Sequence, residues 1–143
     1  MKRNLPQNVT VVSAIDPISF ATTTARAGNA IDRLGYDSAV FSLNYGIASA
    51  GSANTLTITL ADGATTSPVT AVTFNVTPDV PDSTAAAGIY NMHLDLRGLN
   101  RYIKFTVTPA ATGGGTTYAS GTLVLGDKNV GPVPSAVTVF KKA

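Results

Sequence analysis

The chain has 143 residues, of which 44% are hydrophobic and only 13% are charged. This length suits one domain spanning residues 1–143, and the balance is opposite to that of disordered proteins. The net charge of +2 is too small for a basic nucleic-acid-binding face, and the absence of cysteine excludes disulfides, a thiol nucleophile and a cysteine metal site.

The N-terminal residues 1–8 include Lys2 and Arg3, and no apolar stretch of the kind found in a signal peptide follows them. We expect these residues to form a flexible, solvated arm, and residues 141–143 to form a second one. No run of about 20 apolar residues is present, so the sequence predicts no membrane-spanning segment.

Between the arms, short stretches that alternate in hydrophobicity or are rich in β-branched residues predict strands. Threonine is abundant and glutamate is absent, which favours strands over helices. Residues 25–34 are the best candidate for a short helix, but they contain Gly28 and lack a full apolar stripe, so a loop or a pair of strands is equally expected. Residues 84–88 could form one helical turn. The eight predicted strands cover residues 9–15, 39–45, 56–60, 72–76, 90–96, 102–107, 122–125 and 136–140.

Alternation along the strands means that each sheet has one buried face and one wetter face, as antiparallel sheets do. Two such sheets must cover each other's apolar faces, and no crossover helices separate the strands. The sequence therefore predicts an all-β antiparallel sandwich of about eight strands, arranged like a jelly roll.

Residue types that perform chemistry are sparse. His93 is the only histidine, and Asp95 lies two residues further along the same predicted strand, so both side chains point outward as a surface pair. The other acids are also aspartates, and most stand beside Gly, Pro or Ser, as in Asp62-Gly63, where aspartate forms turns. Asp79 and Asp82 could share a calcium ion, but no calcium-loop spacing supports this.

A run of three glycines and a set of five tyrosines are further candidates for binding sites. Residues 113–115 are three glycines, which lack the following lysine of a phosphate loop and predict a hairpin loop. Five tyrosines could stack on sugars or bases, but their patterns place them in the core or at its rim: Tyr36, Tyr45, Tyr90, Tyr102 and Tyr118. We therefore predict no catalytic, cofactor-binding or metal-binding residues and no enzymatic activity.

The stretch from Leu34 to Pro109 resembles a group of small structural proteins of tailed bacteriophages. The residues that prompt this comparison are 35–41, 44–46, 56–60, 88–90 and 96–105, which include Leu96-Arg97-Gly98-Leu99-Asn100-Arg101. The resemblance covers about half of the chain and consists of strands and turns rather than a site motif. It implies a capsid cement, or decoration, protein that lies on the virion exterior as a homo-oligomer and bridges subunits of the major capsid protein.

The surface composition agrees with that role, because a low-charge surface suits a protein that functions in an assembly. We expect the arms and exposed turns to make the contacts, through Lys2, Arg3, Arg97, Asn100 and Arg101, with no nucleic-acid or membrane partner. Dimer and trimer both remain open. The alternatives are a phage head–tail connector or tail protein and a carbohydrate-binding module, which would need exposed aromatic residues on one face.

Overall fold

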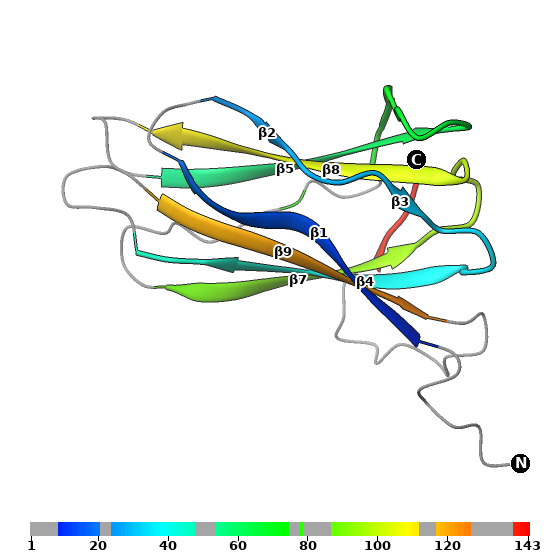
Figure 1. The fold of residues 1–143 in the computed structure, drawn as a ribbon, viewed down its shortest axis with the longest axis horizontal. Helices are drawn as coiled ribbons and strands as arrows, with labels where there is room; N and C mark the ends of the chain where they lie inside the picture. The colour runs from blue at the N-terminus through cyan, green and yellow to red at the C-terminus, as the bar shows by residue number, and fades with distance from the viewer. Residues whose placement is uncertain are drawn as a thin grey trace, which may run out of the picture.

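The computed structural model describes residues 9–20, 24–47, 54–74, 78, 87–111, 117–126 and 139–143. These residues form two layers of strands and no helix (Figure 1). The strands are β1 Val9–Phe20, β2 Arg26–Ala27, β3 Ile31–Asp32, β4 Ser38–Tyr45, β5 Asn54–Gly63, β6 Thr70–Val72, β7 Gly88–Asp95, β8 Tyr102–Ala111, β9 Thr117–Gly126 and β10 Val139–Phe140.

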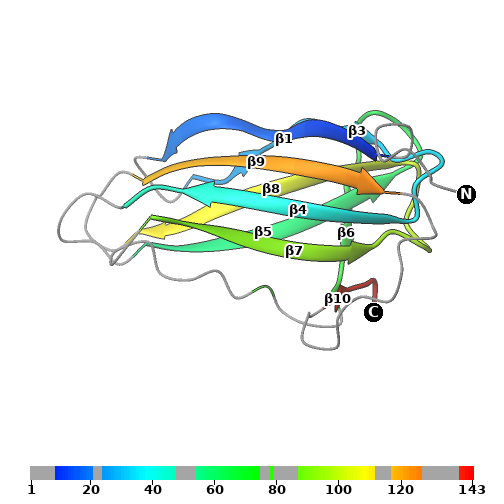
Figure 2. The same cartoon turned by 90° about the horizontal axis from the view of Figure 1, so that it is seen from below.

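The strand order confirms the predicted β-sandwich and its jelly-roll arrangement. Sheet A has the order β1-β9-β4-β7-β10, and sheet B has the order β2-β8-β5-β6, with β3 also paired to β8. Successive strands cross repeatedly from one sheet to the other, which produces the two nested Greek keys of a jelly roll. The two sheets pack face to face, as Figure 2 shows from below.

The core lies between the sheets and is built from alternate residues of every long strand. Phe41 on β4 and Phe105 on β8 are fully buried and stack across the layers, with ring centroids 4.1 Å apart and planes 6° from parallel. Leu43, Met92 and Leu123 from sheet A surround this pair together with Ile58 and Ile103 from sheet B. The strands that the sequence predicts therefore point the expected residues inward.

Several strands, including β5 and β8, are longer than the sequence predicts, and the extensions of β1 and β9 have identifiable physical causes. Asp16-Pro17 was expected to end the first strand, but β1 continues to Phe20 through two register irregularities between Ser13 and Ile18. Proline is tolerated there because β1 is an edge strand, so no neighbour needs its missing N–H. Gly121 lies within β9, where a Cβ atom would stand 2.7 Å from the Phe41 ring. Glycine is needed there for close packing and does not mark a strand end.

The ambiguous segment 25–34 forms the short strands β2 and β3, which both pair with β8, so the strand-pair interpretation is correct. In the segment predicted as one turn, Gly88 begins β7, and residues 84–86 lie outside the described part. The predicted strands 72–76 and 136–140 are described only in part. Val72 ends β6, Phe74 forms an isolated bridge, and β10 comprises Val139 and Phe140.

The C-terminal residues contact both sheets. β10 runs parallel to β7, with Phe140 opposite Leu94, and Lys142 bridges Phe74 just beyond β6. The buried Phe140 ring meets Phe74 edge-on at 5.8 Å. The Ala143 N–H donates to the carbonyl of Thr73 at 2.8 Å. Where the sequence suggested a free arm at 141–143, the structure gives residues 142 and 143 backbone partners; the expected arm 1–8 lies outside the described residues.

We expect Phe105→Ala to lower the free energy of unfolding by about 3–5 kcal/mol, because it removes one ring of the stacked pair and leaves a cavity. Thr106→Ala, the next residue on β8 with its side chain outward, should change that free energy by less than about 0.5 kcal/mol. Urea unfolding followed by circular dichroism measures both. Equal effects of the two variants would contradict the assignment of Phe105 to the centre of the core.

Candidate interaction surface

The outer face of sheet A is the broadest regular surface of the described residues. Outward side chains lie in three rows across the strands, set by the register of β1, β9, β4 and β7. We define the outer face of sheet A by these rows: Val11, Val124, Val40 and His93; Ser13, Thr122, Ser42 and Asn91; and Ser120, Asn44 and Ile89. Val11 and Ile89 are each 63% exposed, so large apolar side chains face solvent here.

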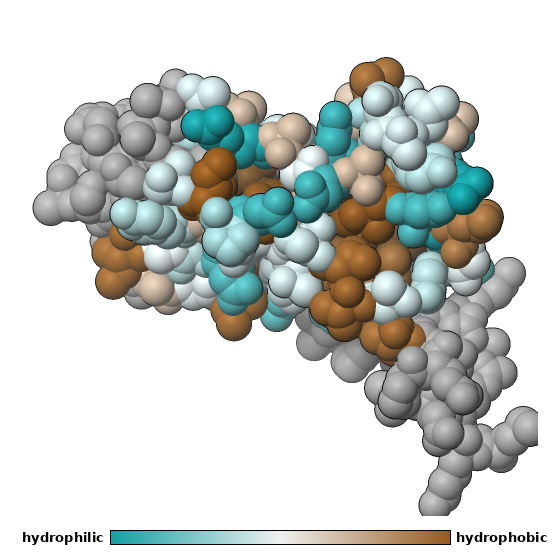
Figure 3. All heavy atoms as spheres, viewed as in Figure 1, coloured by the Kyte–Doolittle hydropathy of each residue, from teal (hydrophilic) through white to brown (hydrophobic). Residues whose placement is uncertain are grey.

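These three rows are nearly free of charge, although Asp95, on the same side of β7 in the next row, is paired with Arg97. His93, at the β7 side, is the only ionisable residue in the three rows. The outer face of sheet B differs, because Thr57, Thr59, Thr106 and Thr108 share it with Lys104. Figure 3 shows the edge of the sandwich where β1, β2 and β3 lie in front, and there apolar residues stand beside strongly hydrophilic ones. Two uncharged surfaces can be buried together without stripping water from ions.

The predicted contact residues of the β7–β8 connection lie together at one end of the sandwich, and each has a partner within the chain. Arg97 is 70% exposed and forms an ion pair with Asp95, Nη2 to Oδ2, at 2.5 Å. Arg101 binds Asp32 at 2.6 Å and lies over the Tyr102 ring, 5.1 Å from its centroid. Lys2 and Arg3 lie outside the described residues.

Asn100 clamps the loop onto a buried carboxylate. Its backbone N–H and its side-chain amide donate to Asp62 Oδ2 at 2.8 and 3.2 Å. Asp62 is fully buried near the end of β5, so its assignment to an exposed turn was wrong. Among the described residues its Oδ1 atom has no hydrogen-bond partner. Asp62 therefore holds the β7–β8 loop through Asn100. The Asp62-Gly63 dipeptide by itself does not indicate this role.

Arg33 is an organising residue that sequence reasoning missed. Its guanidinium donates to the carbonyls of Leu99, of Asn100 at 2.8 Å and of Tyr36 at 3.1 Å. These bonds join the β3–β4 turn to the β7–β8 loop. Both loops contain a glycine with positive φ, Gly35 at 87° and Gly98 at 82°, in the third position of a tight turn. The glycines indicate from the sequence that both segments are turns. That Arg33 of one turn binds the carbonyls of the other loop could not be predicted from the spacing of residues along the chain.

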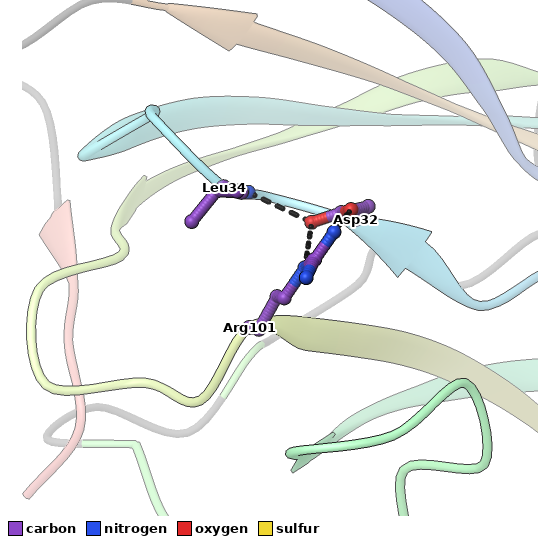
Figure 4. Close-up of polar contacts among 3 residues, drawn as sticks. All are labelled: Asp32, Leu34 and Arg101. Carbon is purple, nitrogen blue, oxygen red and sulfur yellow. Dashed lines mark hydrogen bonds and ion pairs between the residues drawn. The ribbon is translucent and has the colours of Figure 1, made fainter.

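The surface ion pairs shift their carboxyl pKa values in a common direction. The hydrogen bond from Arg101, helped by the Leu34 N–H, lowers the pKa of Asp32 below its ordinary value of 3.8 (Figure 4). The hydrogen bond from Arg97 likewise lowers the pKa of Asp95, against a smaller opposing effect of burial. Both aspartates are therefore held in the charged form, which suits structural pairing rather than proton transfer.

His93 and Asp95 project from the same side of β7, as expected, but Asp95 engages Arg97. In the described ranges, no group of three or more acids or histidines gathers where it could hold a metal ion. No helix in those ranges could cross a bilayer. The described residues thus offer surfaces for binding and no assembled catalytic group.

Comparison with known proteins extends the description of the fold. No family model matches the sequence, and no curated protein matches it. Among solved structures, that of infectious bursal disease virus Gt strain is similar, with a TM-score of 0.51, 17% identity, and coverage of 83% of this chain and 32% of that one. The infectious bursal disease virus VP2 subviral particle gives a TM-score of 0.50, 20% identity, and coverage of 83% and 32%.

The chain therefore spans about a third of the length of these structural relatives. At such low identity, the likeness establishes a shared fold, and it agrees with the jelly-roll strand order described above.

We expect Arg33→Met to lower the free energy of unfolding by about 1–3 kcal/mol, because it retains the aliphatic stem and leaves three loop carbonyls without their charged donor. Arg26→Met on β2 is the matched control, since Arg26 is exposed and has no hydrogen bond recorded to the described residues. Chemical denaturation compares the two. An effect no larger than that of Arg26→Met would show that the loops are held together by other contacts.

Acid should weaken the two ion pairs. A carboxyl whose pKa is lower in the folded state contributes stability above its unfolded pKa and loses it as the pH falls through the folded value. The stability advantage of the native chain over Arg97→Gln/Arg101→Gln should therefore be constant near neutrality and shrink below about pH 4. Thermal unfolding at stepped pH tests this; an advantage that grows on acidification would contradict it.

Proposed function

We propose that this chain is a non-enzymatic structural protein of a virion, which binds the outside of an assembled phage capsid and stabilises it by bridging neighbouring subunits. Its partner is the major capsid protein, and it acts there as a homo-oligomer on the capsid exterior. The observation that carries the proposal is the set of three rows on the outer face of sheet A, in which His93 is the one ionisable residue, on a jelly roll.

Two independent likenesses support a virion role. The phage-like pattern of residues 34–109 covers β4, β5, β7 and most of β8, which form the middle of both sheets. The structures of similar fold come from infectious bursal disease virus and particles derived from it. Jelly rolls recur in viral capsid domains, although the same fold also carries sugar sites, so the fold alone does not decide the function.

The physical properties of the face suit a repeating lattice. A surface of Val, Ser, Thr and Asn can be covered at little electrostatic cost, since only His93 in its rows can carry charge. Weak contacts at each copy would be multiplied when an oligomer engages several capsid subunits at once. A rigid sandwich loses little conformational entropy on binding, so modest contacts per copy suffice.

The loop arginines form a second proposed contact zone beside this face. Arg97 projects into solvent even though Asp95 pairs with it, and Asn100 is exposed although its amide binds Asp62. Lys2, Arg3 and Arg101 belong to the same proposal. If Arg97→Glu/Arg101→Glu bound shells as tightly as the native chain while remaining folded, Arg97 and Arg101 would be removed from the contact set.

A charged residue in the middle of the outer face of sheet A should disrupt attachment. We expect Thr122→Lys to weaken binding to assembled shells at least about tenfold, because a buried, unpaired ammonium costs more than about 1.4 kcal/mol. Thr59→Lys places the same charge at mid-strand on the outer face of sheet B and is the matched control. Co-sedimentation with shells measures both variants. Loss of binding by Thr59→Lys alone would assign attachment to the other sheet.

Imaging whole particles tests the role itself. Cryo-electron microscopy of virions should show this domain repeated on the shell at local symmetry axes. A head–tail connector would instead form a ring of defined copy number at one vertex. Absence from the whole particle would overturn the structural proposal.

A further inference from the structure

A groove of about 690 Å³ crosses one end of sheet A, where it takes in the third row of the outer face, Ser120, Asn44 and Ile89, and extends beyond it to the strand ends. All four long strands of the sheet contribute to its lining, so we call it the strand-end groove. The hollow exists because small residues occupy the strand ends there, namely Gly46, Gly88 and Ala119. Larger side chains, including those of Tyr45, Tyr118 and Ile89, flank them.

The glycine at position 88 is required by the groove's own geometry. A Cβ atom there would lie 2.6 Å from the Tyr45 hydroxyl and 2.9 Å from the ring carbon that bears it. The Tyr45 ring therefore lies against bare backbone of β7. On β9, Tyr118 contacts the Gly46 position, and the Gly46 N–H donates to the Tyr118 carbonyl at 2.7 Å. Two tyrosines from adjacent strands are thus fixed at the groove.

The lining combines exposed apolar surface with polar groups that carry no charge. Tyr118 and Ile89 are each 63% exposed, so the groove presents two large apolar side chains close together. Asn44, Ser19 and Ser120 supply amide and hydroxyl groups beside them. Among the residues that the structure describes, no Asp, Lys, Arg or His lines the groove. Its chemistry therefore selects against ionic ligands.

A sugar fits this combination better than a peptide strand does. A pyranose ring has an apolar C–H face that packs on an aromatic ring and a rim of hydroxyls that bond to amides and hydroxyls. A peptide that added itself as a strand would need a free sheet edge. The strand-end groove instead runs across strands whose backbones already pair with one another: β1 with β9, β9 with β4, and β4 with β7.

We propose that the strand-end groove binds a neutral oligosaccharide, with Tyr118 as the stacking platform and Asn44, Ser19 and Ser120 as partners of the sugar hydroxyls. Across four strands about 4.8 Å apart, the groove is about 14 Å long, which suits a short oligosaccharide rather than a single ring. The inference rests on the groove's own lining and not on the capsid role: Tyr118 lies outside the three rows, whereas Asn44 and Ser120 belong to the third row, so attachment through that row would cover part of the groove.

The test is an NMR titration of the ¹⁵N-labelled full chain with neutral trisaccharides built from glucose, mannose, galactose or N-acetylglucosamine, with sialyllactose as the anionic control. At least one neutral trisaccharide should produce saturable shifts at Ser19, Asn44, Tyr118 and Ser120, and sialyllactose should bind more weakly. Tyr118→Ala should weaken binding at least about tenfold, as loss of a central aromatic anchor does. Tyr118→Phe should retain it.

Tyr102→Ala is the matched control, since Tyr102 lies on β8 in the other sheet beside Arg101 and should leave sugar binding unchanged. Asn44→Ala provides a second variant with little consequence for the core, because Asn44 is an exposed outward residue. Unchanged amide dispersion shows that each variant is folded. The proposal is overturned if no neutral trisaccharide gives saturable shifts, or if Tyr118→Ala binds as the native chain does. Groove shifts that depend on protein concentration alone would instead assign the groove to a second copy of the chain.

Discussion

The stacking of Phe41 on Phe105 is the contact on which the rest of the sandwich depends. It joins the central strand β4 of sheet A to β8 of sheet B, and both rings are completely buried. Its closeness forces glycine at position 121, because any side chain there would collide with the Phe41 ring. The same stack fixes which residues of β4, β8 and β9 point inward. The outward alternation that creates the uncharged face of sheet A follows from it.

The two ends of the sandwich are built by different chemistry. At one end, Arg33 ties two tight turns together, Asn100 caps the buried Asp62, and Arg97 and Arg101 pair with neighbouring aspartates. At the other end of sheet A, the strand-end groove is lined by tyrosine, small residues and uncharged amides or hydroxyls. At the first end most of these polar groups bind one another, Asp62 Oδ1 excepted, whereas at the second end uncharged polar side chains line a groove. The binding capacity of this part of the chain therefore lies on sheet A.

The alternation of apolar residues in the sequence was enough to predict the core strands. It was not enough to predict which residues join the loops or line the strand-end groove. Alternation in residues 39–45 and 102–107 correctly predicted the inward faces of β4 and β8, because a period of two is a local property. Asp16-Pro17 was expected to end a strand and the predicted strand 122–125 began after Gly121, whereas β1 and β9 continue through both positions, because proline is tolerated at an edge and glycine fits against a distant ring. Asp62 and Arg33 act on residues more than 35 positions away along the chain, through contacts that no spacing rule encodes. Tyr118, expected at the core or its rim, is instead the exposed wall of the groove.

The two proposed binding surfaces overlap at the third row of sheet A, because Ser120, Asn44 and Ile89 also line the strand-end groove. Attachment through the first two rows would bury Val11, Val40 and Thr122, while Tyr118 lies nearer the end of its strand. Weak sugar binding by a single groove would become effective on a shell that displays many copies, since multivalency multiplies affinity without any new contact. If the outer face of sheet A is turned toward the capsid, the strand-end groove can remain accessible only where that face overhangs a gap between subunits. A domain that bridges neighbouring subunits provides such an overhang, so the geometry of attachment determines whether both surfaces act at once.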